Sequence, residues 1–79
     1  MPELVLYYTE FCHLCEQAEL ILAGAGMAEG YRKTDIEDDE ALLERYGVRI
    51  PVLKRLDSGE ELSWPFGPDE LRVFLGAEK

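Results

Sequence analysis

The sequence predicts one α/β domain over residues 1–79, in which strands and helices follow the order β-α-β-α-β-β-α. Three observations carry this prediction: a short apolar run near the N-terminus, two amphipathic helical patterns that each follow a strand-like segment, and hairpin-type turn residues before a third helical pattern. A strand-helix-strand unit favours a parallel pair, whereas a hairpin adds an antiparallel strand. We therefore expect one four-stranded mixed sheet flanked by helices.

The first predicted strand leads directly into the first predicted helix. Leu4 to Tyr8 is apolar and aromatic without alternation, which is typical of a central strand that is covered on both faces. Apolar residues then recur at helical spacing between polar ones, until Gly24 and Gly26 end the pattern. The inner face of this helix is expected to consist of Leu14, Ala18, Ile21, Leu22 and Ala25.

A second strand is predicted over residues 30–35, and a second helix follows it. Asp38 or Asp39 can cap this helix, because a carboxylate accepts hydrogen bonds from the free N–H groups of a first turn. Gly47 is expected to end the helix in the left-handed conformation. The inner face is expected to consist of Leu42, Leu43 and Tyr46.

The C-terminal part of the chain predicts a hairpin and a last helix. Val48 to Leu56, interrupted by Pro51, is expected to form a loop and the third strand, and the turn residues 57–59 lead into a fourth strand over residues 61–64. A proline at the first helical position and acids in the first turn start the last helix at residues 67–70. Its inner face is expected to contain Leu71, Phe74 and Leu75, with Gly76 as its stop. The complete order of elements is a thioredoxin-like layout.

Composition excludes several classes of function. A hydrophobic fraction of 47% argues against disorder, and no apolar run has the length of a membrane span. The acidic balance, 17 Asp and Glu against 8 Lys and Arg with a formal net charge of −9, predicts that the protein binds neither nucleic acid nor a membrane surface. It favours partners that carry a positive patch. Because Met1-Pro2-Glu3 does not begin a secretory signal, we expect a cytoplasmic protein.

Cys12-His13-Leu14-Cys15 contains both cysteines of the chain and lies where the first strand gives way to the first helix. Two thiols three residues apart on a first helical turn share one face and can close a disulfide. The partial positive charge and free N–H groups of a helix N-terminus stabilise a thiolate, which is the nucleophile in disulfide exchange. The motif therefore predicts a redox-active dithiol with a lowered thiol pKa.

Two other interpretations of the motif stay open. The spacing would suit half of a zinc site, but zinc needs four ligands and His13 is the only further sulfur or nitrogen ligand in the sequence, so we expect no metal site. A structural disulfide or two inert buried thiols would have the same spacing. In a reducing compartment, however, paired cysteines are more often catalytic, redox-sensing or metal-binding than permanently bridged.

Charged neighbours are expected to tune the dithiol. Glu10, Glu16 and Glu19 are close in sequence, and negative charge near a thiolate opposes the effect of the helix terminus. His13 is expected to be exposed and, when protonated, to favour the thiolate of Cys12. Arg49 is the cation that could supply positive charge to the site, with a solvated surface arginine as the alternative.

Three motifs, taken in their order and spacing, resemble the glutaredoxin family. They are the C-x-x-C at a strand-to-helix junction, Ile50-Pro51-Val52 at the start of the third strand, and Gly67-Pro68-Asp69-Glu70 at the start of the last helix. The likeness covers nearly the whole chain. It is closest to small bacterial glutaredoxin-like proteins of uncharacterised function, of which the segment from Asp35 to Leu53 is typical.

The resemblance implies a role for each matching residue. Cys12 would be the nucleophile that forms a mixed disulfide, and Cys15 the buried thiol that resolves it. Pro51 would be the cis-proline of the family, which turns the backbone of Ile50 toward the dithiol to pair with an extended thiol substrate. The alternative for Pro51 is an ordinary loop proline before an edge strand.

The resemblance also has consequences for glutathione. The start of the last helix, near Gly67 and Asp69, matches the place where glutaredoxins bind the terminal groups of glutathione. Glutaredoxins usually carry a lysine three residues before the first cysteine, where this chain has Thr9, and paired glycines before the last helix, where it has Trp64-Pro65-Phe66-Gly67. These departures argue against a preference for glutathione more than against disulfide exchange.

The sequence therefore predicts a glutaredoxin-like thiol–disulfide oxidoreductase that acts through a mixed disulfide. No bound organic cofactor is expected, and glutathione or a reductase would return the electrons. Its partners would be a disulfide-containing protein or a small thiol. The alternative is a non-enzymatic module on the same fold, either an iron–sulfur-cluster-binding scaffold that uses Cys12 or a redox-sensing adaptor for a basic partner.

Overall fold

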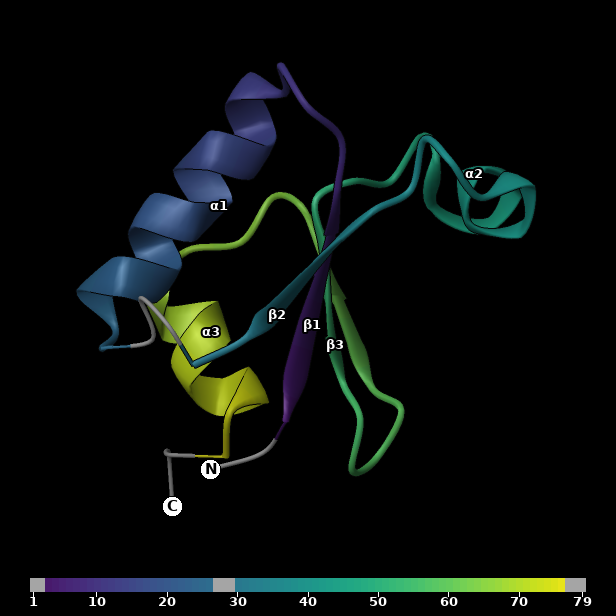
Figure 1. The fold of residues 1–79 in the computed structure, drawn as a ribbon. Coiled ribbons are helices and arrows are strands. Elements are labelled where there is room, and N and C mark those ends of the chain that lie inside the picture. The colour runs from purple at the N-terminus through teal and green to yellow at the C-terminus, as the bar shows by residue number, and fades with distance from the viewer. Residues whose placement is uncertain (1–2, 27–29, 77–79) are drawn as a thin grey trace.

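The computed structural model describes residues 3–26 and 30–76, which form the predicted seven elements in the predicted order (Figure 1). The strands are β1 (Leu4–Tyr8), β2 (Arg32–Asp35), β3 (Val52–Arg55) and β4 (Glu61–Ser63), and the helices are α1 (His13–Gly24), α2 (Glu40–Tyr46) and α3 (Pro68–Phe74). The α/β, thioredoxin-like fold class is confirmed. The predicted domain range, 1–79, extends beyond the described residues at both ends.

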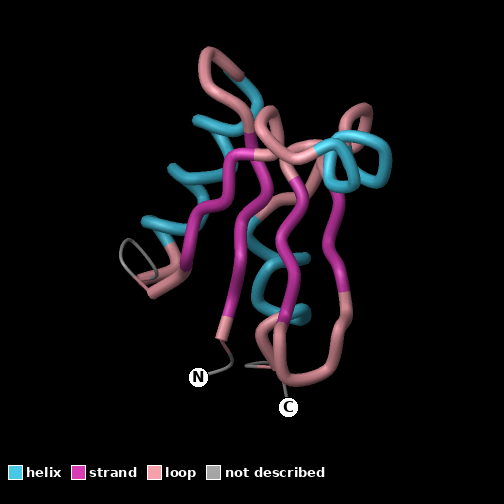
Figure 2. Tube along the Cα trace, turned by 45° about the vertical axis from the view of Figure 1, so that its right-hand side comes forward, coloured by secondary structure: helices cyan, strands magenta, loops and turns pink. Residues whose placement is uncertain are grey.

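The four strands form one mixed sheet in the order β2-β1-β3-β4. β1 pairs in parallel with β2 and antiparallel with β3, and β3 pairs antiparallel with β4 across the predicted hairpin. Tyr7 lies opposite Val52, so β1 ends at the same end of the sheet at which β3 begins. The connection from β1 into α1 lies at that end, and the β3–β4 turn lies at the other (Figure 2).

The two faces of the sheet are covered by different helices. Because side chains alternate along a strand, Leu4 and Leu6 of β1 face α1 and α3, whereas Tyr7 faces α2. The first face contains the larger buried cluster, formed by Leu4, Leu6, Leu22, Leu53 and Leu71. The second contains Ile36, Tyr46 and Val52, and there the ring of Tyr7 stacks on that of Tyr46 with 4.4 Å between centroids.

Local chemistry sets the ends of α2 and α3. Of the two candidate caps, Asp39 is the one used: its carboxylate accepts hydrogen bonds from the N–H groups of Ala41 and Leu42, at 3.0 and 3.2 Å. At the start of α3, the Glu70 carboxylate reaches back to accept from the Gly67 N–H at 2.9 Å. Gly76 follows α3 with a φ of 77°, as expected of a left-handed stop.

Gly47 corrects one prediction, because it ends α2 in the right-handed region with a φ of −53°. Glycine is needed there for a different reason: a Cβ at this position would clash with the carbonyl oxygen of Leu43. The Gly47 N–H also donates a hydrogen bond of 2.8 Å to that oxygen. The glycine therefore allows a close backbone approach and does not reverse the chain.

The predicted inner faces of α1 and α2 are also partly wrong. Leu14 and Leu43 are 44% and 41% exposed, and Ala25 is exposed beyond the end of α1. The buried positions of α1 are Cys15, Ala18 and Leu22, whose spacing of three and four residues defines one stripe. Cys15 thus occupies the inner position that the prediction gave to Leu14. Among residues 3–26 and 30–76, no helix has the length and apolar character needed to cross a bilayer.

Candidate redox site

The backbone turns sharply between β1 and α1 to present the dithiol. Phe11 has a φ of 60°, the left-handed region that bulky residues rarely adopt, and its side chain is 95% exposed. Cys12 then returns to an extended conformation as the N-cap residue, and α1 begins at His13. Sheet, turn and helix start therefore place Cys12 at the first turn of a 12-residue helix, as the sequence predicted.

Cys12 and Cys15 form a disulfide with 5.2 Å between their Cα atoms. The two sulfurs differ in access to solvent, since Cys15 is 2% exposed whereas Cys12 is only partly buried. This difference agrees with the expected roles, in which a partner must reach the sulfur of Cys12 but not that of Cys15. In a chain with two cysteines, no further thiol can compete for either.

The sulfur of Cys12 takes the place that a hydroxyl or carboxylate oxygen usually has in an N-cap. Its Sγ accepts a hydrogen bond from the Cys15 N–H at 3.1 Å. The same N–H would stabilise negative charge on that sulfur after reduction, together with the positive end of the helix dipole. The geometry thus favours the thiolate at Cys12.

A cavity of about 400 Å³ opens beside the dithiol. Its walls are the segment from Tyr8 to Cys12, the α1 residues Cys15, Glu16 and Glu19, and Lys33 from β2. The described residues that line this cavity do not include the residues that the sequence predicted to bind substrate, which are Arg49, Ile50, Pro51, Gly67 and Asp69. The cavity combines the Cys12–Cys15 disulfide with three carboxylates and one ammonium group.

Lys33 is the cation that sequence reasoning missed. Its Nζ lies 3.2 Å from a carboxylate oxygen of Glu19 and 4.7 Å from the ring centroid of Tyr8. Glu19 also accepts a hydrogen bond from the Tyr31 hydroxyl, whose pKa is raised to about 12, first by burial and then by the charge of Glu19. Thr9 leaves the usual lysine position of glutaredoxins without a charge, and β2 brings a lysine into the cavity instead.

The other charged neighbours of the dithiol face solvent. His13, Glu10 and Glu16 are exposed, as expected for His13 between the cysteines. Within residues 3–26 and 30–76, neither Glu10 nor Glu16 forms an ion pair. In the same part of the chain, no three His, Cys, Asp or Glu side chains are grouped so as to hold a metal ion.

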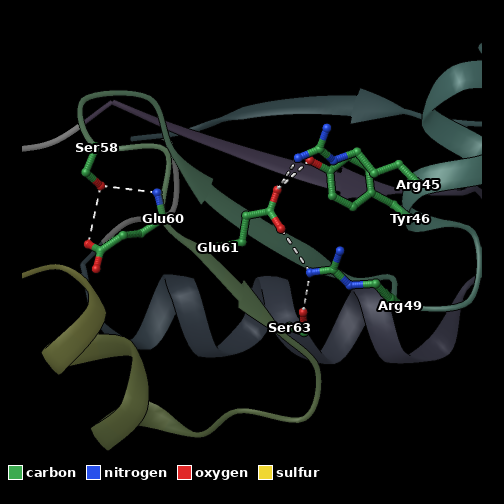
Figure 3. A network of polar contacts seen from close by, with 7 residues as sticks. All are labelled: Arg45, Tyr46, Arg49, Ser58, Glu60, Glu61 and Ser63. Carbon is green, nitrogen blue, oxygen red and sulfur yellow. Dashed lines mark hydrogen bonds and ion pairs between the residues drawn. The ribbon is translucent and has the colours of Figure 1, made fainter.

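Arg49 is held in a separate polar network between α2 and β4 (Figure 3). Its guanidinium donates to the Glu61 carboxylate at 2.9 Å and to the Ser63 hydroxyl at 3.0 Å, and lies 5.4 Å from the ring centroid of Tyr46. The Tyr46 hydroxyl donates to the other oxygen of Glu61 at 2.6 Å. The positive charge expected to serve the dithiol is therefore bound to Glu61.

The network shifts the pKa of both of its acidic members. Burial is the main cause that raises the pKa of Tyr46 to about 12, followed by its hydrogen bond to Glu61. The pKa of Glu61 lies below its usual value, mainly because it accepts from Tyr46 and secondly from Arg49, although burial opposes the shift. Glu61 is thus held as a carboxylate and Tyr46 as a neutral phenol.

Ile50 and Pro51 lie where β3 begins. The peptide bond between them is cis, as is the one between Trp64 and Pro65, for which the sequence offered no specific signal. The strand register puts Pro51 at the end of the sheet where β1 leads toward the dithiol. The Ile50 N–H donates to the Tyr46 carbonyl oxygen at 3.1 Å, so backbone pairing with a substrate would have to displace this bond or use the Ile50 carbonyl oxygen.

Gly67 and Asp69 lie apart from the dithiol cavity. The Gly67 N–H is engaged by Glu70, and the Asp69 carboxylate forms an ion pair of 2.6 Å with Arg72. Asp69 lines a second cavity, of about 490 Å³, between β4 and α3. The structure does not bring these two residues into one pocket with Cys12.

A thioredoxin-like fold with a C-x-x-C pair at the start of its first helix defines the class of protein, and comparison with protein families narrows it. Residues 3–76 match the model of the glutaredoxin-like domain (DUF836). The chain belongs to this family, as its resemblance to small glutaredoxin-like proteins predicted.

Solved structures of similar proteins agree with the family. The X-ray structure of target protein XcR50 from X. campestris has 45% identity and a TM-score of 0.85, covering 96% of this chain and 99% of that one. Its solution structure has 44% identity and a TM-score of 0.83, over 100% and 97%. Protein Ne2328 from Nitrosomonas europaea has 29% identity and a TM-score of 0.71, over 94% and 92%. A comparison with curated proteins found no match.

Proposed function

We propose that this protein is a thiol–disulfide oxidoreductase that uses Cys12 for attack and Cys15 for resolution. The observation that carries the proposal is the placement of the Cys12 sulfur, which accepts from the Cys15 N–H at the start of α1 while Cys15 itself is 2% exposed. One sulfur is accessible and favoured as an anion, and the other is enclosed next to it. Membership of a glutaredoxin-like family supports the same chemistry.

The proposed reaction has two exchange steps. The Cys12 thiolate attacks one sulfur of a substrate disulfide, forms a mixed disulfide and releases the other substrate sulfur as a thiolate. Cys15, after losing its proton to water, attacks the Cys12 sulfur and releases the second substrate thiolate. The substrate gains two electrons, and the protein is left with the Cys12–Cys15 disulfide.

The remaining assignments complete this proposal. A disulfide-containing protein or a small thiol is the substrate, and glutathione or a reductase returns the two electrons without a bound organic cofactor. Ile50 and Pro51, at the end of the sheet that β1 and β3 share, would contact the substrate backbone, and His13 would add positive charge when protonated. Arg49, Gly67 and Asp69 would contact only the outer parts of a long substrate. We place the protein in the cytoplasm, acting on neither nucleic acid nor membrane.

Mass spectrometry of single-cysteine variants tests the proposal. We expect the reduced protein to reduce hydroxyethyl disulfide and end as an intramolecular disulfide. Cys15→Ser should stop at the mixed disulfide and gain the mass of one mercaptoethanol unit. Cys12→Ser should lose at least about 100-fold in rate, because the remaining thiol, that of Cys15, is buried and is not at the N-cap of α1.

Two results would contradict the proposal. If the wild-type dithiol exchanges no faster than a free thiol of the same concentration, the site is not an exchange catalyst. If Cys12→Ser keeps the wild-type rate, attack does not begin at Cys12. An absorbance band at visible wavelengths in the freshly purified protein would point instead to the iron–sulfur-cluster-binding alternative.

A further inference from the structure

The cavity beside Cys12 has an unbalanced charge. It is lined by the carboxylates of Glu10, Glu16 and Glu19 and by the ammonium group of Lys33. At neutral pH these groups carry three negative charges against one positive charge. A substrate that brings its disulfide to Cys12 must therefore enter a region of negative potential.

The positive charge of Lys33 is already used within the cavity. Its ammonium group pairs with Glu19 at 3.2 Å and lies against the ring of Tyr8, so these two charges largely cancel. Glu10 and Glu16 have no such partner among the described residues, 3–26 and 30–76. Their charges remain for an incoming molecule.

The positions of these two carboxylates bracket the reacting sulfur. Glu10 is two residues before Cys12, and Glu16 is four residues after it, one helical turn along α1. Both side chains are exposed, whereas Cys12, which a substrate must reach, is partly buried. Negative charge thus lies in the same cavity as the sulfur that we expect to attack.

Phe11 adds a second feature that suits the same kind of ligand. It immediately precedes Cys12, is 95% exposed, and has a backbone φ of 60°. The face of an aromatic ring attracts a cation, and the ring also covers the aliphatic stem of a lysine or arginine. An exposed ring between two carboxylates is a poor surface for an anion.

We propose that the dithiol cavity selects disulfides that carry positive charge next to the reacting sulfurs, and disfavours anionic ones such as glutathione disulfide. The inference rests on the proposed function and names its substrate class. Each glutathione unit has two carboxylates and one ammonium group, so its disulfide carries a net charge of −2 and meets Glu10 and Glu16 with like charge. A basic polypeptide with a disulfide meets them with opposite charge. The exchange steps and their electron balance are those given above.

Three small disulfides that differ in charge test this selectivity. They are cystamine with two ammonium groups, uncharged hydroxyethyl disulfide, and dithiodiglycolate with two carboxylates. The rate at which each oxidises the reduced wild-type protein is divided by its rate with dithiothreitol, an uncharged dithiol, which removes differences in intrinsic reactivity. We expect the normalised rate for cystamine to exceed that for dithiodiglycolate about tenfold at low ionic strength, and the ratio to fall toward one in high salt.

A charge-matched pair of variants locates the effect. Glu10→Gln combined with Glu16→Gln should reduce the ratio to about a third or less at low salt. Glu40→Gln combined with Glu44→Gln makes the same change in net charge on α2, which covers the other face of the sheet, and should leave the ratio within about a factor of 1.5 of the wild type. Glu19 is left unchanged because its loss would release Lys33.

The outcomes separate the inference from the function on which it rests. If the three normalised rates agree within about twofold, or if the α2 variant lowers the ratio as much as the cavity variant, charge selection at the cavity is wrong while the oxidoreductase stands. If uncharged hydroxyethyl disulfide also fails to react faster than with a free thiol, the proposed function itself fails.

Discussion

The dithiol cavity and the network around Glu61 use the same kinds of residue in opposite ways. Around Glu61, one carboxylate receives hydrogen bonds from Tyr46 and Arg49 and has Arg45 within 3.9 Å, so cations outnumber the acid. In the cavity there are three acids and one lysine. Lys33 pairs with Glu19, and the charges of Glu10 and Glu16 are exposed. Partly buried charge that is fully paired fixes structure, whereas exposed charge without a partner is available to a ligand.

The difference also separates two tasks within a small domain. The Glu61 network joins α2 to β4 across residues that lie 12 to 15 positions apart in the chain. The cavity joins α1 to β2 through the ion pair between Lys33 and Glu19. We therefore expect substitutions in the network to change stability, and substitutions in the cavity to change reactivity.

The largest effect on stability is expected from Glu61→Ala. The variant leaves the hydroxyl of Tyr46, a residue that is 1% exposed, without its acceptor and removes the ion pair of Arg49. We expect a loss of about 2–4 kcal/mol in the free energy of unfolding, measured by urea denaturation followed by circular dichroism. Glu10→Ala is the control and should cost less than about 0.5 kcal/mol. Equal losses in both variants would contradict the comparison.

A smaller effect is expected from Tyr46→Phe, which should cost about 1–2 kcal/mol at neutral pH because one partly buried hydrogen bond is lost. The variant should also change the alkaline limit of stability. The pKa of Tyr46 in the folded protein, about 12, exceeds its ordinary value of 10.0, so its contribution to stability is complete below pH 10 and is lost as the pH rises to about 12.

Urea denaturation from about pH 9 to pH 12 measures this alkaline loss. Tyr31, whose pKa is also raised to about 12, keeps its own contribution in the variant, so the loss should become shallower without disappearing. If the wild type and the Tyr46→Phe variant lose stability in parallel as the pH rises, folding does not raise the pKa of the Tyr46 phenol.

The smallest effect on stability is expected from Glu10→Gln combined with Glu16→Gln. These side chains are exposed and the whole chain has a formal net charge of −9, so removing two charges relieves repulsion as much as it removes favourable contacts. The free energy of unfolding should stay within about 0.5 kcal/mol of the wild type. A loss as large as that of Glu61→Ala would mean that the cavity acids have a structural role.

Most of the fold could be predicted because its signals are local. The apolar run of β1, the turn before β4, and the proline and acids at the start of α3 each act within a few residues. The prediction for Gly47 was wrong because a glycine can follow a helix for two different structural reasons. At Gly47 a Cβ would clash with the Leu43 carbonyl oxygen. The sequence alone does not distinguish this requirement from that of a left-handed helix stop.

The candidate site was predictable only as far as it is contiguous in sequence. Cys12 and Cys15 lie three positions apart within one motif, and the cap by the Cys12 sulfur follows from that spacing. Lys33 reaches the cavity through the parallel register that sets it beside Leu6, 27 positions earlier in the chain. The place of Arg49 just before Ile50-Pro51 predicts a charge for the dithiol, but pairing between β3 and β4 brings Glu61 and Ser63 to it instead.

The hydrogen bond from the Cys15 N–H to the Cys12 sulfur connects the chemistry of the site to the start of a helix. A thiolate is a strong acceptor for that amide, and a sulfur in a disulfide is a weak one. Each change in the oxidation state of Cys12 therefore alters the strength of this hydrogen bond in the first turn of α1. The backbone amide of Cys15 is consequently a built-in reporter, whose proton experiences every change of charge on the neighbouring sulfur.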